Sequence, residues 1–254
     1  MAKALGLVYG FAAYLVFLLA FLYMVGFFGN FAVAKSIDSG TSGSLGSAFV
    51  IDLLLVALFG VQHSVMARPW FKRRWTRIVP RPLERSTFVL ITSLVLLLMF
   101  WQWRPMTQVI WSVGNPVASG LLWALFWAGW VLVLLSTYMI DHFDLFGLKQ
   151  VYLNYRGREH IPPPFKVSWL YTNVRHPMML GLIIAFWAIP TMTLGHFIFA
   201  AGFTGYILYA IQLEERDLET SLGDDYTRYR RRVSMLLPLP AVRALKRANL
   251  TPEP

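Results

Sequence analysis

The sequence of 254 residues contains no cysteine and few charged side chains. The absence of cysteine excludes disulfides, thiolate metal sites and cysteine nucleophiles. Charged residues make up 14% of the chain, whereas soluble domains carry about 25%. Hydrophobic residues make up 57%, and several uninterrupted apolar runs reach the roughly 20 residues that a helix needs to cross a bilayer. The composition therefore excludes an ordinary soluble domain and predicts a polytopic membrane protein.

Acidic residues are scarce as well, with 13 against 23 basic residues and a net charge of +10. Such a balance can indicate nucleic-acid binding, but here the basic residues cluster beside the apolar runs. Seven lie between Arg68 and Arg85, and eight follow the last apolar run. Lysine and arginine in loops beside a span typically face the cytoplasm and anionic lipid. We therefore expect the lipid bilayer as a partner and no nucleic acid, and no obligate protein partner is evident.

The apolar runs predict an all-α, polytopic transmembrane helix bundle that forms a single integral-membrane domain over residues 1–254. The first run is too long for the core of a signal peptide, so we expect it to be a retained span. Residues 178–213 begin and end beside basic segments, so this stretch must cross the membrane and return, with a turn near Pro190 and Gly195. The count is six spans, or five if one hairpin arm is shallow. The expected spans are 5–31, 47–67, 86–103 and 118–140 in the front half (1–140), then the hairpin arms 178–189 and 193–213.

The charges of the linkers predict the topology. The positive-inside rule places both termini, residues 68–85 and residues 141–175 in the cytoplasm. Residues 141–236 are expected to hold a polar loop, the hairpin and a helix over 214–236 that continues from the last span. The spacing of Tyr226, Tyr229 and Val233 predicts that they share one face of that helix. Residues 237–254 are interpreted as a solvated basic tail.

The tripeptide Arg175-His176-Pro177 stands where the hairpin begins. Proline suits the first position of a helix, which makes His176 the expected N-cap. Free N–H groups at a helix start attract anions, and the guanidinium of Arg175 suits a carboxylate. One interpretation is a site for a ligand carboxylate. The other is an ordinary helix start whose arginine binds lipid phosphate.

Glu214 and Glu215 stand where the hairpin ends. Carboxylates at the end of a span are costly unless they have partners or lie at the interface. One of them could accept hydrogen bonds from a ligand. The alternative is an interfacial ion pair with Arg216 or with the basic run 228–232.

These motifs, in this order and spacing, resemble the isoprenylcysteine carboxyl methyltransferase superfamily of integral-membrane enzymes. The resemblance covers roughly residues 150–236. It implies S-adenosylmethionine (SAM) as the cofactor, bound in a pocket at the cytoplasmic face. The matching positions are Arg175, His176, Pro177, Gly181, Glu214, Glu215, Leu218, Gly223, Tyr226, Tyr229 and Val233. The cofactor-binding residues that we expect are Gln150, Tyr171, Arg175, His176, Pro177, Met179, Gly181, Glu214, Glu215, Tyr226 and Tyr229.

Two positions depart from the superfamily pattern and bear on the substrate. Met179 replaces a tyrosine, so a softer contact to the cofactor is implied. Ala210 stands where the isoprenylcysteine enzymes carry an arginine, which argues against a carboxylate substrate. The segments 62–67, 141–150 and 175–181 together resemble a bacterial branch of the superfamily that methylates small thiols. That resemblance implies SAM-dependent S-methylation of methanethiol to dimethyl sulfide in the inner (plasma) membrane.

Three other functions remain open from the sequence. A membrane methyltransferase could act on another substrate, such as a lipid amine. An NADPH-dependent reductase of the sterol-reductase kind shares the architecture of the C-terminal half, although no site for a nicotinamide phosphate stands out. A non-enzymatic transporter or scaffold is the third. Binding of S-adenosylhomocysteine or of NADPH discriminates between them.

The thiol reaction needs a group that promotes ionisation, because the thiolate is the nucleophile. The first candidate base is His63, near the cytoplasmic end of the second span. Asp52 shares its helix face about 16 Å away and could orient it only through a bend or a bridging water. The second candidate is His142 with Asp141, and Arg175 could stabilise the thiolate instead.

Each of these histidines has a simpler interpretation, as an interfacial side chain bonded to backbone carbonyls. A metal site formed by His63 and His142 is a further interpretation. Their spacing matches no short metal motif, so no metal is expected.

Overall fold

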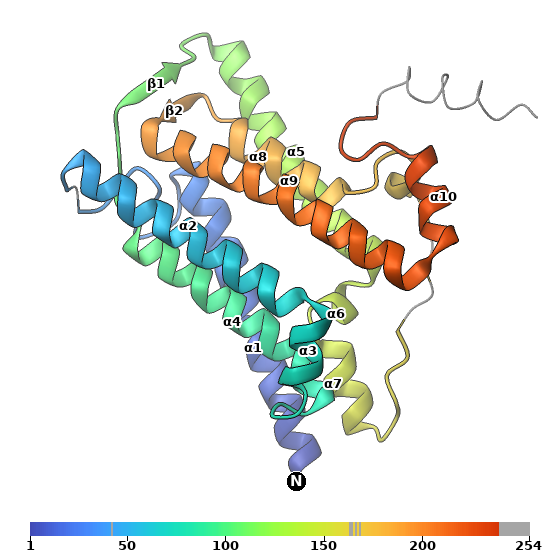
Figure 1. Cartoon of the computed structure of the whole chain (residues 1–254). Helices are drawn as coiled ribbons and strands as arrows, with labels where there is room; N and C mark the ends of the chain where they lie inside the picture. Colours follow the sequence, from blue (N-terminus) through green and yellow to red (C-terminus); the bar gives the residue numbers. More distant parts are fainter. Residues whose placement is uncertain (42, 163–164, 166, 168, 239–254) are drawn as a thin grey trace, which may run out of the picture.

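The computed structural model describes residues 1–41, 43–162, 165, 167 and 169–238, and it is a bundle of long helices (Figure 1). Five of its helices are long and apolar enough to cross a membrane. This confirms the predicted all-α transmembrane bundle. The five are α1 (Ala2–Gly29), α2 (Leu45–Ala67), α4 (Arg81–Gln102), α5 (Pro116–Ile140) and α9 (Leu194–Leu222).

The first arm of the predicted hairpin is short. Helix α8 (Pro177–Trp187) has 11 residues, which is about 16 Å of helix and too little to cross a bilayer alone. The chain then continues in extended form through β2 (Thr191–Thr193). Strand β2 pairs in antiparallel fashion with β1 (Val109–Ser112), which lies in the linker between α4 and α5. The structure therefore agrees with the five-span alternative, in which one arm of the hairpin is shallow. The two strands were not predicted.

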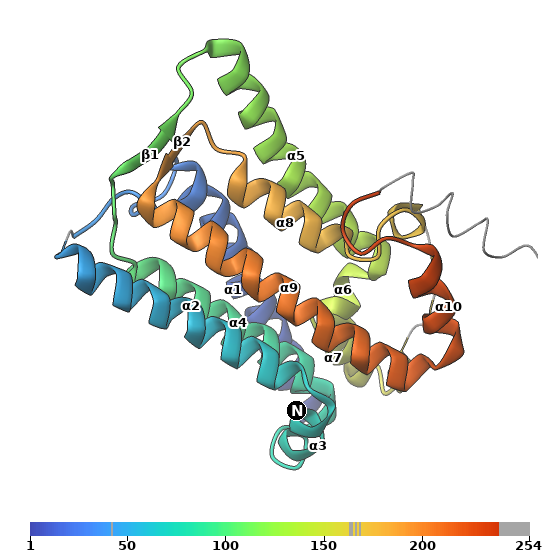
Figure 2. The same cartoon turned by 45° about the horizontal axis from the view of Figure 1, so that its top comes forward.

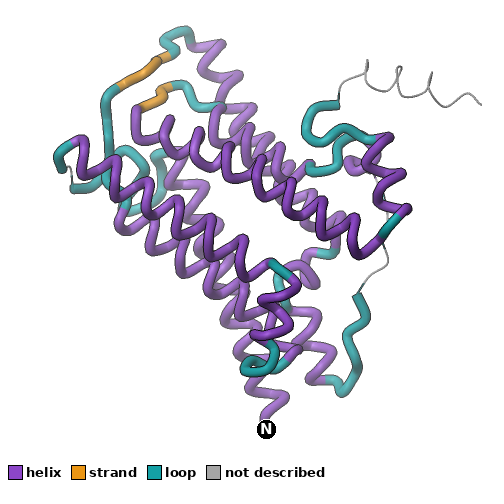
Figure 3. Tube along the Cα trace, in the orientation of Figure 1, coloured by secondary structure: helices purple, strands orange, loops and turns teal. Residues whose placement is uncertain are grey.

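The two ends of the bundle carry different elements (Figure 3). We call the end with residues 30–41, β1 and β2 the strand end. The opposite end, which we call the motif end, carries the N-terminus and most of the short helices (Figure 1). The described parts of the segments that the charge pattern assigned to the cytoplasm lie at the motif end. Its elements are α3 (Pro69–Trp75), α6 (His142–Leu145), α7 (Leu148–Tyr155), the 3₁₀ helix η1 (Trp169–Thr172) and α10 (Asp224–Arg232).

The strand half of the bundle is filled by a core of aromatic side chains. These rings come from the ends of α1 and α4 and from the parts of α5, α8 and α9 that face them. The rings of Phe199 and Phe203 stack at 4.1 Å, and Trp103 is fully buried beside them. The largest members are Phe27, Phe28, Phe100, Trp103, Phe126, Phe186 and Phe199. Because this half is packed with apolar side chains, the polar residues of the two motifs gather at the other end.

Two glycines bring α8 against α5, which lie side by side in Figure 2. A Cβ atom built on Gly129 would lie 2.7 Å from the carbonyl oxygen of Gly181. A Cβ built on Gly181 would lie equally close to the carbonyl oxygen of Gly129. Neither position has room for a side chain, so these glycines set the distance between the helices. Helix α8 begins with the Arg-His-Pro motif, and its packing on α5 therefore positions that motif.

The chain breaks after the last span and turns back over the start of α8. A continuous helix over 214–236 was predicted, but α9 ends at Leu222 and α10 begins at Asp224. Gly223 between them has φ 59°, a left-handed conformation that favours glycine. The segment after α10 then accepts hydrogen bonds from the backbone N–H groups of Arg175 (2.9 Å) and His176 (3.1 Å). Most of the predicted basic tail, residues 239–254, lies outside the described residues.

Candidate functional site

A cavity of about 490 Å³ lies at the motif end, between the end of α5, the start of α8, the end of the apolar part of α9, and α10. The residues that line it are Met139, Ile140, Asp141, Phe165, Val167, Tyr171, Arg175, His176, Met178, Met179, Glu214, Leu218, Tyr226 and Tyr229. Eight of them are among the catalytic and cofactor-binding residues that the sequence predicted, and they come from five separate segments of the chain.

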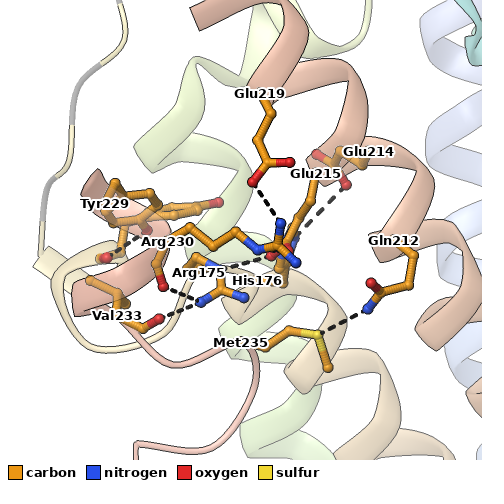
Figure 4. A network of polar contacts seen from close by, with 11 residues as sticks. Arg175, His176, Gln212, Glu214, Glu215, Glu219, Tyr229, Arg230, Val233 and Met235 are labelled. Carbon is orange, nitrogen blue, oxygen red and sulfur yellow. Dashed lines mark hydrogen bonds and ion pairs between the residues drawn. The ribbon is translucent and has the colours of Figure 1, made fainter. Parts of the chain in front are cut away.

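The carboxylate of Glu215 is the centre of a buried ionic network (Figure 4). It is 1% exposed, and its Oε1 accepts hydrogen bonds from Arg175 Nε at 2.7 Å and from His176 Nε2 at 3.0 Å. Its Oε2 lies 3.0 Å from the Nε of Arg230. The network ties together α8, α9 and α10. The interpretation of this carboxylate as an ion pair is correct, and Arg230 belongs to the expected basic run.

The guanidinium of Arg175 makes three hydrogen bonds inside this network. Beyond its bond to Glu215, it donates to the backbone carbonyls of Arg230 (3.0 Å) and Val233. Its side chain is largely buried, although it forms part of the cavity wall. Arg175 therefore holds the C-terminal segment against the start of α8, an arrangement that differs from the lipid-bound arginine considered above.

Glu214 faces the cavity, in contrast to its neighbour in the sequence. Successive residues of an α-helix point about 100° apart, so one carboxylate of the pair is buried and the other faces the ligand space. The Glu214 side chain is 49% exposed. Its nearest ionisable neighbour is His176, whose Nδ1 lies 3.8 Å from Glu214 Oε2, too far for a hydrogen bond. The carboxylate can therefore accept hydrogen bonds from a ligand.

Aromatic side chains form the wall opposite α9. The hydroxyl of Tyr229 donates to the backbone carbonyl of Tyr171 at 2.7 Å, and the ring of Phe165 lies 5.6 Å from that of Tyr229. The hydroxyl of Tyr226 is buried and has no hydrogen-bond partner among the described residues. Burial raises the pKa of Tyr229 to about 12 and raises the pKa of Tyr171 and Tyr226 as well. All three phenols are therefore neutral near pH 7, and Tyr226 can bond to a polar ligand group.

The remaining wall of the cavity is apolar and rich in thioethers. Met139 and Ile140 come from the end of α5, and Met178 and Met179 come from the first turn of α8. Methionine is flexible and polarisable, so such a wall adapts to small apolar groups. Met179 stands at the position where the superfamily pattern has a tyrosine.

His142 and Asp141 are neighbours that do not form the expected pair. The Thr137 hydroxyl donates to the Leu134 carbonyl, so it accepts from His142 Nδ1, 2.8 Å away. His142 Nε2 then accepts from the Tyr14 hydroxyl at 2.7 Å. Both ring nitrogens are thus engaged away from the cavity, and burial lowers the pKa of His142.

Asp141 lines the cavity, but its partners are elsewhere. Its carboxylate caps α6 by accepting from Asp144 N, and it pairs with Lys149 Nζ at 2.5 Å. The hydrogen bond from Lys149 holds the pKa of Asp141 below its usual range. It is therefore an ionised cap and not the partner of a base.

His63 and Asp52 lie apart from the cavity and from each other. The imidazole of His63 lies between the rings of Phe59 and Phe88, with centroid distances of 5.3 and 5.0 Å. Asp52 is fully buried toward the strand end, where it accepts a hydrogen bond from the backbone N–H of Arg104 at 2.9 Å. The carboxylate is therefore held away from His63, and neither residue lines the cavity.

Three expected cofactor-binding residues have structural roles. The side-chain amide of Gln150 donates to the carbonyl of Asp144 at 3.0 Å and does not line the cavity. Pro177 is buried at the first position of α8, as its type predicted. Gly181 lies at the contact with α5 described above. Pro177 and Gly181 help to position the α8 motif without lining the cavity themselves.

Several cavity residues were missed in the sequence. Phe165 and Val167 come from a loop with no periodicity, so no local signal identified them. Met139 and Ile140 end the predicted span 118–140, and their apolar type did not distinguish them from the rest of the span. Leu218 matched the superfamily pattern but was not expected to bind the cofactor, and Met178 lies between motif positions; these places in the motifs are the signal that could have found them. Within the described part of the chain, no group of three or more metal-ligating side chains is present.

The chain is a membrane-embedded helix bundle with a cavity at one end that is lined by polar and apolar side chains. The chain belongs to the NnrU protein family, whose sequence model matches residues 52–245. Several relatives carry the name methanethiol S-methyltransferase. The one from Mycobacterium tuberculosis is 56% identical over 240 residues, which cover 94% of this chain and 98% of the relative. No solved structure matches the chain.

Two further relatives with this name are similar over comparable lengths. Methanethiol S-methyltransferase 1 of Bradyrhizobium diazoefficiens is 55% identical over 236 residues, 93% of this chain and 83% of the relative. The enzyme of Crocosphaera subtropica is 49% identical over 238 residues, 94% of this chain and 93% of the relative. The alignments thus span the front half of the bundle as well as the motif end.

Proposed function

We propose that the chain is an integral-membrane enzyme that transfers the methyl group of SAM to methanethiol and so produces dimethyl sulfide. The observation that carries this proposal is the cavity, which gathers the motif residues Tyr171, His176, Glu214, Tyr226 and Tyr229 at one end of the bundle. Relatives named for this reaction, similar over nearly the whole chain, support the choice of substrate.

The residues present fit a ligand with the groups of SAM. Glu214 offers an acceptor to an ammonium or to ribose hydroxyls, and the unpartnered hydroxyl of Tyr226 offers a further polar contact. Phe165 and the three tyrosine rings can stack on a purine. The volume of about 490 Å³ falls within the range of about 300–1,000 Å³ found for small-molecule sites.

The bound cofactor supplies an electrophilic methyl group on a positively charged sulfur. In the displacement step itself, the protein chiefly holds the reacting atoms in line. Aromatic faces and the Glu214 carboxylate stabilise a cation in the cavity. The buried network around Glu215 keeps the start of α8 rigid, and the apolar wall excludes water from the reacting sulfur.

The apolar wall suits a small thiol. Met139, Ile140, Met178 and Met179 present no charged anchor, and a methyl thiol needs none. Ala210 occupies the position at which the isoprenylcysteine enzymes carry an arginine, so a substrate carboxylate has no partner there. These features favour an uncharged acceptor over the lipid amine and the carboxylate.

We place the protein in the inner membrane with the motif end toward the cytoplasm. The basic residues of α3 and α10 lie at this end, as the positive-inside rule requires. Both termini are then cytoplasmic, and the cavity opens to the compartment that contains the cofactor.

The direct test is to incubate the purified protein in nanodiscs with SAM and a series of methyl acceptors. We expect dimethyl sulfide in the headspace with methanethiol, and little transfer to a lipid amine. Calorimetry should detect binding of S-adenosylhomocysteine and none of NADPH. Binding of NADPH without S-adenosylhomocysteine would refute the proposal in favour of a reductase, and methylation of the lipid amine alone would refute the substrate assignment.

A further inference from the structure

His176 is held rigidly at the edge of the cavity. It is the N-cap residue of α8, its backbone N–H donates to the Met235 carbonyl at 3.1 Å, and the residue is 7% exposed. The imidazole lies between the two adjacent carboxylates of α9. Its Nε2 is 3.0 Å from Glu215 Oε1, and its Nδ1 is 3.8 Å from Glu214 Oε2 (Figure 4).

The surroundings of Glu215 determine which ring nitrogen of His176 carries hydrogen. Arg175 and Arg230 stabilise the Glu215 carboxylate in its ionised form, which can only accept hydrogen bonds. The Nε2 of His176 must therefore be the donor. In the neutral imidazole, the lone pair is then on Nδ1, the nitrogen on the side of Glu214 and the cavity. No described residue donates a hydrogen bond to this nitrogen.

The other histidines lack this combination. The chain has five histidines, all within the described residues. His142 has both ring nitrogens bonded, and His160 pairs with Asp144. His196 is buried near the strand end, and His63 lies between two phenylalanines. Among the five, only His176 both lines the cavity and keeps an acceptor nitrogen to which no described residue donates.

We propose that His176 is the general base of methyl transfer, with Glu215 as the residue that positions it. This rests on the proposed function. The thiol proton of the acceptor passes to His176 Nδ1, and the freed sulfur electron pair forms the new carbon–sulfur bond. The old carbon–sulfur bond breaks, and its electrons remain on the donor sulfur. The resulting imidazolium is stabilised by the Glu215 carboxylate, as in histidine–carboxylate dyads of other enzymes, and later releases its proton to water.

The first test uses His176→Gln, which can keep a hydrogen bond to Glu215 but lacks a basic nitrogen. At saturating SAM, we expect kcat with methanethiol to fall roughly 10²–10⁴-fold, the usual contribution of a general base. The loss should shrink with a fluorinated alkyl thiol that is already ionised at the assay pH. The acidic limb of the wild-type pH profile should disappear. His160→Gln is the matched control, because this histidine is ion-paired outside the cavity, and it should keep both rate and profile.

A second test does not depend on activity. ¹⁵N-histidine NMR of the protein in nanodiscs, with the signals assigned by difference from His176→Gln, should show His176 at pH 8 with hydrogen on Nε2 and none on Nδ1. A doubly protonated ring at that pH would overturn the assignment. So would a His176→Gln variant that loses affinity for S-adenosylhomocysteine but keeps kcat at saturating SAM. Absence of dimethyl sulfide with the wild-type protein would instead refute the proposed function.

Discussion

The contact between α5 and α8 offers a quantitative test of how the fold positions the site. In Gly181→Ala, the new Cβ would lie 2.7 Å from the Gly129 carbonyl oxygen and 3.0 Å from the backbone nitrogen of Val133. Ordinary van der Waals contact begins at 3.4 Å, so the helices must part by about 0.7 Å. Overpacking of this kind costs about 1–3 kcal/mol, and the better helix propensity of alanine offsets up to about 1 kcal/mol.

Gly120→Ala provides the matched control. Gly120 is also helical, on α5, but a Cβ there would have nothing within 4 Å. This variant should show only the propensity gain, so the difference between the two variants isolates the packing cost. Thermal unfolding in nanodiscs should give a lower Tm for Gly181→Ala than for Gly120→Ala, by about 2–4 °C for each kcal/mol.

The same shift should be measurable in the cavity. His176 and Met179 lie in the first turn of α8, so a movement of about 0.7 Å reaches both of them. Misplacement of that order can reduce activity by up to about 100-fold. Calorimetry should show weaker binding of S-adenosylhomocysteine to Gly181→Ala than to Gly120→Ala. Equal Tm and equal affinity for the two variants would refute the reasoning that this glycine positions the site by close packing.

Three further predictions concern the cavity, the topology and the pH dependence of stability. Glu214→Ala should weaken S-adenosylhomocysteine binding by about 10–100-fold, the worth of one hydrogen bond to a charged group, and wild-type affinity in calorimetry would remove this residue from the site. A cysteine introduced at Gly43 should react with an impermeant thiol reagent applied from outside, while one at Thr76 should not; the chain has no cysteine of its own, and the reversed pattern would contradict the topology. Because burial lowers the pKa of His142, the unfolded chain binds its proton near pH 6.5 while the folded chain does not. The folded state should therefore become less stable as the pH drops from 7.5 to 5.5. Thermal unfolding of His142→Gln should show a smaller loss of Tm over this range. An equal loss of Tm in the variant would contradict the conclusion that the folded protein holds this ring neutral.

The sequence predicted the helical class and most of the spans because these depend on local properties. Apolar runs of about 20 residues have few alternatives to a transmembrane helix. The spacing of Tyr226 and Val233 predicted that they share one helix face, and both side chains are buried. The break itself was missed, because the helix pattern on its two sides is continuous.

The motifs identified the region of the site for a similar reason. Arg175, His176 and Glu214 were all expected to lie together, and the structure places them around one cavity. Their residue types indicated either binding of a polar ligand or ion pairing at the membrane interface. What the sequence by itself determined is thus the membrane location, the bundle and the set of residues from which the site is built.

The role of each residue in that set was decided by the tertiary structure alone. Glu214 and Glu215 are adjacent and identical in type, yet one faces the cavity and the other neutralises two arginines in the interior. His63 and His142 resembled base candidates, but their partners come from distant helices that no local pattern reveals. The physical reason is that a side chain's role depends on which groups share its space. Helix packing brings those groups together from distant parts of the sequence: Tyr14 and His142, for example, are 128 residues apart.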